Sequence, residues 1–311
     1  MDVEKFIEEK VAQIKETVGQ DKAINALSGG VDSSVVTALG HRALGDQLET
    51  VFLDDGLMRE KEPESVAAAF EPLGIRVRIV EVKDRFFSTL KGIEDPEEKR
   101  KAFRDMFYTC LGEVVKASDA RFLLQGTIKA DIMETQKGVK TQHNILEQIG
   151  IDPEAGYGFK VIEPLVELFK PGVRQVAIGL GLPEEIAQRM PFPGPGLATR
   201  CLGEVTPERI EIVRQAVKIV EEETKVIPAF QCFAALLKDR ATGLKADGSR
   251  EFGHMIVVRC VESEDALTAE PVHLPWDVLR KIEKRIAGEI AEVSRVLYDL
   301  TPKPPATIEY I

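Results

Sequence analysis

The chain has 311 residues, of which 44% are hydrophobic and 30% are charged, and its formal net charge at pH 7 is −11. This length is enough for two domains with separate cores, and the acidic balance argues against bulk binding of nucleic acid. No apolar run approaches the roughly 20 residues of a membrane helix, and the charged N-terminus lacks the core of a signal peptide, so we expect a cytoplasmic protein with no membrane partner.

The first half of the chain alternates helical and extended patterns. Helices are expected at 3–18, from 34 onward, at 60–73 and at 95–118, and strands at 22–27, 49–54, 75–82 and 121–126. The helix at 95–118 opens with Asp95 and Pro96, which are typical of a helix N-terminus. This alternation predicts an α/β fold whose doubly wound parallel sheet is covered by helices on both faces.

The second half contains a long polar stretch and a sharp boundary. Residues 127–158 are polar with weak periodicity, which predicts a lid over a site. The run Pro191–Gly196 excludes both helix and central strand, so we place a boundary there between domains 1–190 and 191–311. A smaller α+β domain should follow, with helices at 206–224 and 276–293, strands near 229–237 and 252–261, and a short C-terminal strand. The four cysteines form no Cys-x-x-Cys pair, so reduced thiols are expected.

The most informative motif is Ser-Gly-Gly-Val-Asp-Ser-Ser at Ser28–Ser34, between a strand and a helix. We call it the phosphate turn. Its glycines allow a tight bend that brings main-chain N–H groups against an anion, and the helix that follows directs its positive end there. Asp32 suits such a site if Mg²⁺ intervenes, or it caps the helix. The alternative is a capped strand-to-helix turn without a ligand.

The phosphate turn resembles the PP-loop of the N-type ATP pyrophosphatases, which have an adenine nucleotide alpha hydrolase-like fold. This resemblance implies cleavage of ATP between its α and β phosphates and transfer of AMP to a substrate oxygen. The ATP site would then comprise Ser28, Gly29, Gly30, Val31, Asp32, Ser33 and Ser34, with Leu53 and Gly56 from the next strand end. Leu53 is equally well explained as strand core.

Five further segments resemble the GMP synthase family. They are Asp54–Glu60, Gln125–Glu134, Val139–Asn144, Pro191–Leu197 and Lys303–Glu309. The resemblance implies a carbon–nitrogen ligase that uses Mg²⁺ and ATP to adenylylate O2 of XMP, after which ammonia displaces AMP to give GMP. The C-terminal domain would mediate a homodimer and help to bind XMP.

The same resemblance assigns the remaining site residues. Asp32 and Asp131 would bind metal, Lys140 and His143 would act from the lid, and XMP would be held by Arg100, Gln231, Lys303, Thr307, Ile308 and Glu309. Simpler interpretations are a helix N-cap for Asp131 and a solvated position for Lys140 and Arg100.

The sequence departs from the family in the lid and leaves two alternatives open. Gln142 stands where the family has a histidine, and Ile145 stands where the family has a valine. The alternatives are another amidating PP-loop enzyme, such as an NAD synthetase, and a non-catalytic nucleotide-binding homologue. Because the phosphate turn begins at residue 28, we expect no glutaminase domain before it, and ammonia would come from a separate glutaminase subunit or from solution.

Overall fold

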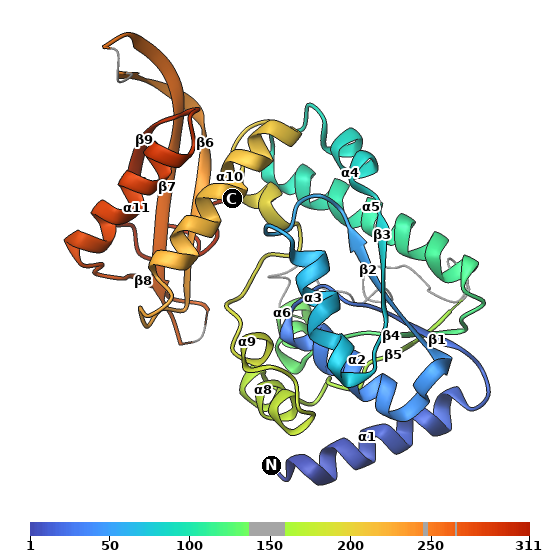
Figure 1. The fold of residues 1–311 in the computed structure, drawn as a ribbon. Helices are drawn as coiled ribbons and strands as arrows, with labels where there is room; N and C mark the ends of the chain where they lie inside the picture. The colour runs from blue at the N-terminus through green and yellow to red at the C-terminus, as the bar shows by residue number, and fades with distance from the viewer. Residues whose placement is uncertain (137–158, 245–247, 265) are drawn as a thin grey trace. The chain divides into compact units, whose positions relative to one another are not determined.

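The computed structural model describes residues 1–136, 159–244, 248–264 and 266–311 (Figure 1). These residues form two compact units. Unit 1 contains residues 1–54, 61–82 and 105–189, and unit 2 contains residues 55–60, 83–104 and 190–311. A single division at residue 190 therefore does not describe the short segments 55–60 and 83–104, which belong with unit 2. The functional roles expected for two domains stay predictions.

Unit 1 is built on a sheet of five parallel strands, as the sequence predicted. Their order across the sheet is β3 (Val77–Glu81), β2 (Leu48–Asp54), β1 (Ala23–Ala26), β4 (Phe122–Leu124) and β5 (Lys160–Ile162). The chain runs outward from β1 to β3 and then returns to the other side of β1 with β4. This reversal between β1 and β4 is the topological switch point of a doubly wound sheet.

The helices of unit 1 flank this sheet (Figure 1). They are α1 (Val3–Val18), α2 (Val31–Leu44), α3 (Glu62–Phe70), α6 (Lys129–Gln136), α8 (Lys170–Gly179) and α9 (Glu184–Ala187). Helices α1, α2 and α8 pack against one another. The apolar stripe of α1 accounts for this, because Phe6, Ile7, Ile14 and Val18 are all buried.

Two helices differ from the expectation. Helix α4 (Lys83–Leu90) was not predicted. It is short, buries only Phe86 and Leu90, and begins directly after the residues predicted as a strand, with no glycine or proline between them. Helix α6 occupies the start of the segment expected as a lid, and residues 137–158 lie outside the described residues. The expected start of α5 (Pro96–Ala117) is confirmed, since the Asp95 carboxylate accepts from the N–H groups of Glu97 at 2.9 Å and Glu98 at 3.0 Å.

Unit 2 contains the second sheet. Strand β6 (Gln231–Leu244) pairs with β7 (Arg250–Glu262) in an antiparallel hairpin, and β7 pairs on its other side with β8 (Glu270–Pro271) and β9 (Val293–Tyr298). Helices α10 (Pro207–Glu223) and α11 (Trp276–Glu289) pack against each other, and they contact β6 and β9 respectively. The helix expected to reach residue 293 therefore ends earlier, and Val293 instead begins β9, parallel to β7.

The chain ends in a segment without regular secondary structure, residues 299–311, which we call the tail. All four cysteines are buried free thiols, and Cys232 faces Cys260 across the β6–β7 pair. None of the helices in the described part of the chain combines the length and apolar character needed to cross a bilayer.

The proline–glycine run at Pro191–Gly196 contains one glycine at which any side chain would clash with the backbone of Leu57. Gly196 has φ +59°, and a Cβ atom on it would lie 2.3 Å from the carbonyl oxygen of Leu57. The same carbonyl accepts a hydrogen bond of 2.7 Å from the N–H of Leu197. Gly194, two residues earlier, lies outside the left-handed region and has open space where a Cβ would stand.

We therefore predict that Gly196→Ala lowers the free energy of unfolding by about 2 kcal/mol or more, because it adds backbone strain and a steric clash. Gly194→Ala is the matched control and should change it by less than about 0.5 kcal/mol. Denaturant unfolding of the full chain measures both. Equal effects of the two substitutions would contradict the role given to Gly196.

Candidate functional site

The phosphate turn lies at the switch point of the parallel sheet. It joins the end of β1 to α2, and Gly126 follows the neighbouring strand β4. A Cβ atom on Gly126 would lie 3.1 Å from the backbone carbon of Asp32 and 3.1 Å from the nitrogen of Ser33. The segment after β4 is thus packed directly against the first turn of α2. Crevices at such a position are where doubly wound sheets bind ligands.

Serine hydroxyls close the phosphate turn on itself. The Ser33 hydroxyl donates to the carbonyl of Gly30 at 3.0 Å and accepts from the N–H of Ser28 at 3.2 Å, and the Ser28 and Ser33 hydroxyl oxygens are 3.0 Å apart. Gly30 is the N-cap of α2 and offers no side-chain cap. The first N–H groups of α2 have no partner within the helix, and N–H groups in this position are suited to bind an anion.

A buried polar chain fixes the base of the phosphate turn. The Thr50 hydroxyl donates to Asn25 Oδ1 at 2.9 Å, Asn25 Nδ2 donates to the Thr37 hydroxyl at 2.6 Å, and Thr37 donates to the carbonyl of Ser33 at 2.8 Å. These side chains come from β2, β1 and α2 and are almost completely buried. Because buried polar groups are costly to leave unpaired, the chain holds the first turn of α2 against the sheet.

Asp32 and Ser34 present unsatisfied polar atoms within the turn. Asp32 Oδ2 accepts from Lys170 Nζ at 2.6 Å, while its Oδ1 is buried and has no hydrogen-bond partner among the described residues. The Ser34 hydroxyl oxygen is in the same condition. Orphaned oxygens of this kind fit a cation or a hydrogen-bonding ligand. No group of three or more His, Cys, Asp or Glu side chains that could hold a metal occurs in the described part of the chain.

Asp131 has a structural role at the start of α6. Its Oδ2 accepts from the N–H of Ile128 at 3.0 Å, and its own N–H donates to the carbonyl of Ile128 at 3.1 Å. Asp131 is thus the third residue of α6 and caps the N–H of the residue that precedes the helix, so it is not the N-cap residue of the simpler interpretation. Metal binding by Asp131 stays a prediction. Leu53 is buried in β2, where it pairs with Val80. Gly56, in unit 2, has φ +76°, and its carbonyl accepts from Arg214. Lys140 and His143 lie outside the described residues.

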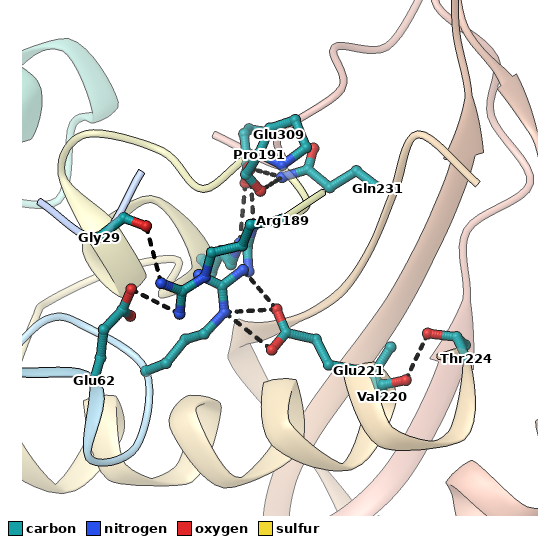
Figure 2. A network of polar contacts seen from close by, with 11 residues as sticks. Gly29, Glu62, Arg189, Pro191, Val220, Glu221, Thr224, Gln231 and Glu309 are labelled. Atoms are coloured by element: carbon teal, nitrogen blue, oxygen red, sulfur yellow. Dashed lines mark hydrogen bonds and ion pairs between the residues drawn. The ribbon is translucent and has the colours of Figure 1, made fainter. Parts of the chain in front are cut away.

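A second polar cluster lies within unit 2, around Glu309 (Figure 2). Arg200 donates to both carboxylate oxygens of Glu309, from Nε at 3.1 Å and from Nη2 at 3.0 Å. Gln231 Nε2 donates to Glu309 Oε1 at 2.5 Å and to the carbonyl of Pro191 at 3.1 Å. Arg200 is 1% exposed, and its Nη1 has no partner among the described residues. Gln231 and Glu309, which are 78 residues apart in the chain and were predicted separately, are therefore in contact.

Arg259 holds the tail in place. Its guanidinium group donates to the carbonyl groups of Thr301 at 2.9 Å, Thr307 at 2.7 Å and Ile308 at 2.9 Å, and it pairs with Asp299 at 2.7 Å. Arg259 is 1% exposed, so these contacts are shielded from water. They use the main chain of Thr307 and Ile308. These two predicted site residues are thus fixed through their backbone.

Two other residues predicted to bind XMP have partners of their own. Lys303 Nζ donates to the carbonyl of Ala266 at 2.8 Å, and Arg100 pairs with Glu97 one helical turn earlier. Lys99, next to Arg100, is 1% exposed, and its Nζ donates to the carbonyl of Cys201 at 2.7 Å. Burial lowers the pKa of Lys99 from its ordinary value.

Comparison with known proteins decides the family. Residues 1–194 match the family model of NAD synthase, and residues 218–310 match that of the GMP synthase C terminal domain. A subunit of the glutamine-hydrolyzing GMP synthase of Archaeoglobus fulgidus is 55% identical over 311 residues, which cover 100% of both chains. This chain belongs to the family of that GMP synthase subunit.

Two further relatives confirm the full-length match. The corresponding GMP synthase subunits of Methanopyrus kandleri and Pyrococcus furiosus are 48% and 52% identical, with 99% of this chain covered in each case and 99% and 97% of theirs. The expectation of a ligase is thereby confirmed. The NAD synthase match ends at residue 194, whereas the GMP synthase relatives extend across the C-terminal domain and the tail. The NAD synthetase alternative therefore explains less of the chain.

Three charged residues of the two clusters were not singled out from the sequence. Lys170 and Arg200 reach Asp32 and Glu309 from positions 138 and 109 residues away in the chain, and Arg259 reaches the tail across more than 40 residues. Local patterns carry no signal for such distant pairs. Arg200 alone could have been suspected, because it closely follows the proline–glycine run.

We predict that Arg259→Met frees the tail, because three carbonyl groups lose their buried donor. Hydrogen exchange at residues 301–309 should become about 10-fold faster or more, as expected for the loss of about 1.4 kcal/mol or more of local stability. Arg295→Met, on the partly exposed β9, is the control and should leave tail exchange unchanged. Unchanged exchange in Arg259→Met would contradict the anchoring role.

Proposed function

We propose that this chain makes GMP from XMP in two steps, using ATP and ammonia. The observation that carries this proposal is the match to GMP synthase subunits along the whole chain, tail included. The orphaned oxygens of the phosphate turn and the Glu309 cluster support it, because they are suited to a Mg²⁺-bound polyphosphate and a purine, respectively.

In the first step, O2 of XMP attacks the α-phosphorus of ATP. A new O–P bond forms, the bond between the α-phosphorus and the bridging oxygen breaks, and pyrophosphate leaves with the electron pair. The products are adenylyl-XMP and pyrophosphate. Main-chain N–H groups at the start of α2, together with the hydroxyls of Ser28 and Ser33, would stabilise charge on the departing pyrophosphate.

In the second step, ammonia attacks C2 of adenylyl-XMP. A C–N bond forms, the C2–O bond breaks, AMP leaves with the electron pair, and the nitrogen loses a proton. The protein needs no covalent nucleophile for either step, because positioning and charge neutralisation are the main sources of rate in such transfers.

Asp32 is the residue that we propose to hold Mg²⁺. The fit rests on its unsatisfied Oδ1. Mg²⁺ usually binds through one or two carboxylates together with substrate phosphates, so a site with a single carboxylate is reasonable before ATP enters. When bound, Mg²⁺ would neutralise charge on the phosphates. Lys170, which pairs with Asp32, would be placed to contact the same phosphates.

Glu309 and Gln231 are proposed to recognise the purine of XMP. Because Gln231 Nε2 already donates to Glu309 and Pro191, the carboxylate of Glu309 and the amide oxygen of Gln231 would accept from N–H groups on the edge of a purine. The Arg200 guanidinium fixes the orientation of the carboxylate. We also propose that Lys303, Arg100, Thr307 and Ile308 contact XMP, that Lys140 and His143 close over ATP, and that Leu53 and Gly56 contact adenine.

A partner would supply ammonia. The relatives are single subunits of enzymes whose names describe them as glutamine-hydrolyzing. We propose accordingly that this chain works with a separate glutaminase subunit and pairs with a second copy of itself through the C-terminal domain.

The central experiment incubates the purified chain with XMP, Mg-ATP and ammonium. We predict GMP, AMP and pyrophosphate in equal amounts, none of them without XMP, and no turnover after chelation of Mg²⁺. An NAD synthetase would instead require deamido-NAD. Binding of ATP without any turnover, with ammonium or with a glutaminase partner, would favour the non-catalytic alternative.

Two substitutions should distinguish the role of the phosphate turn from that of the Glu309 cluster. Asp32→Asn should lower kcat at least about 100-fold, because the charge facing the metal is lost. Glu309→Gln should raise the KM for XMP about 10-fold or more while leaving the KM for ATP within about 3-fold, since a charged hydrogen bond is worth about 1.5–3 kcal/mol. Asp21→Asn, at an exposed ion pair of unit 1, is the control.

A result in which Asp32→Asn turns over like the wild-type protein would exclude a metal role for Asp32. Equal increases in both KM values for Glu309→Gln would argue against purine recognition by Glu309. Unfolding curves of each variant establish that the fold is retained.

A further inference from the structure

A partly buried ion pair, between Arg189 and Glu62, contacts the phosphate turn at Gly29. Arg189 Nη1 donates to the carbonyl oxygen of Gly29 at 3.0 Å, and Arg189 Nη2 lies 2.9 Å from Glu62 Oε1. Figure 2 shows the guanidinium group of Arg189 between these two partners. The Glu62 side chain is 2% exposed and that of Arg189 is 24% exposed. All three residues belong to unit 1.

The contact with Gly29 is close-packed as well as polar. Gly29 has φ +75°, and a Cβ atom on it would lie 2.9 Å from Glu62 Oε1, 3.0 Å from Arg189 Nη1 and 3.0 Å from Val66 Cγ2. Residue 29 must therefore be a glycine for two reasons, its left-handed backbone and the ion pair against it. The conformation of the phosphate turn and the position of the ion pair depend on each other.

This contact sets the direction of one main-chain donor. In a trans peptide the C=O of Gly29 and the N–H of Gly30 point in opposite directions. Because Arg189 binds the carbonyl, the N–H of Gly30 points away from the ion pair. Gly30 is the N-cap of α2, so its N–H belongs to the group of donors at the start of that helix.

We propose that Arg189, itself oriented by Glu62, is a positioning residue for the phosphate turn. It fixes the peptide between Gly29 and Gly30 so that the N–H of Gly30 is available to a nucleotide phosphate before the nucleotide binds. This inference rests on the proposed ATP-dependent function, and it adds Arg189 and Glu62 to the residues on which that function depends.

A guanidinium group suits this task better than an ammonium group. Its planar fork carries separate N–H groups on Nη1 and Nη2, so it donates to Gly29 and to Glu62 at the same time in fixed directions. A lysine would keep the positive charge beside Glu62 but would present one nitrogen to both acceptors. The two substitutions Arg189→Met and Arg189→Lys therefore distinguish charge balance from peptide orientation.

The experiment measures the Kd of pyrophosphate and of ATP by calorimetry, and the KM values for ATP and XMP, for these two variants and the wild-type protein. We expect Arg189→Met to raise the Kd of both phosphate ligands about 10- to 100-fold and to leave the KM for XMP within about 3-fold. Arg189→Lys should give an intermediate Kd with unfolding close to that of the wild-type protein. Arg121→Met, at the exposed ion pair with Asp21, is the control and should change none of these values.

A Kd within about 3-fold of the wild-type value in both Arg189 variants would overturn the proposal. Equal losses for ATP and XMP would do the same, because they would indicate a purely structural role. If Arg189→Met does not fold, the Kd of Arg189→Lys decides. Absence of GMP formation by the wild-type protein would instead refute the proposed function, whereas the pyrophosphate binding of the variants would still test the role of Arg189.

Discussion

The phosphate turn depends on main-chain carbonyl and N–H groups that are held from outside the turn. Gly29 takes a left-handed conformation, Arg189 binds its carbonyl, and the polar chain from Thr50 to Thr37 supports the carbonyl of Ser33. None of these supporting side chains needs to touch a ligand. Their common effect is to keep the N-terminus of α2 and its unsatisfied donors in one place. Preorganisation of this kind is an economical way to bind a polyanion, because little has to reorient when the anion arrives.

The tail, like the phosphate turn, is held by side chains that bind its main-chain and carboxylate groups from outside the segment. Arg259 holds the carbonyl groups of the tail, and Arg200 holds the carboxylate of Glu309. Both arginines are 1% exposed. A buried guanidinium group is expensive unless nearly all of its donors are satisfied, and a segment without regular secondary structure has many carbonyl groups to offer. The two arginines thereby hold the end of the chain in a defined conformation without regular secondary structure.

Local patterns predicted much of the fold. The alternation of β1, α2, β2 and α3 follows directly from apolar periodicity, and the capping Asp95 marks the start of α5 within a residue. Patterns were weaker where an element is short or polar. Helix α6 has no clear apolar face, so it was absorbed into the expected lid. The helix predicted at 276–293 was four residues too long, because the apolar Ile290 and Val293 continue a helical spacing beyond the end of α11.

The candidate site was also predicted only where its residues are close together in the sequence. The phosphate turn could be found because its chemistry is contiguous in the sequence. The assignments of Gln231 and Glu309 came from a family resemblance, and no local pattern links Arg189 or Arg259 to the carbonyl groups that they bind. An arginine on a surface and an arginine bound to a distant carbonyl look alike in a sequence, since only the tertiary fold brings the two partners together.

The division of the chain has a practical consequence for dissecting this enzyme. The backbone passes between the two units after residues 54, 60, 82, 104 and 189. Arg214 donates to carbonyl groups of Gly56 and Met58, and Lys99 donates to that of Cys201, so unit 2 draws on three separate stretches of chain. A fragment cut at a single point near residue 190 would lack two of them. Expression of either half alone would separate Arg214 and Lys99 from the carbonyl groups that accept their hydrogen bonds.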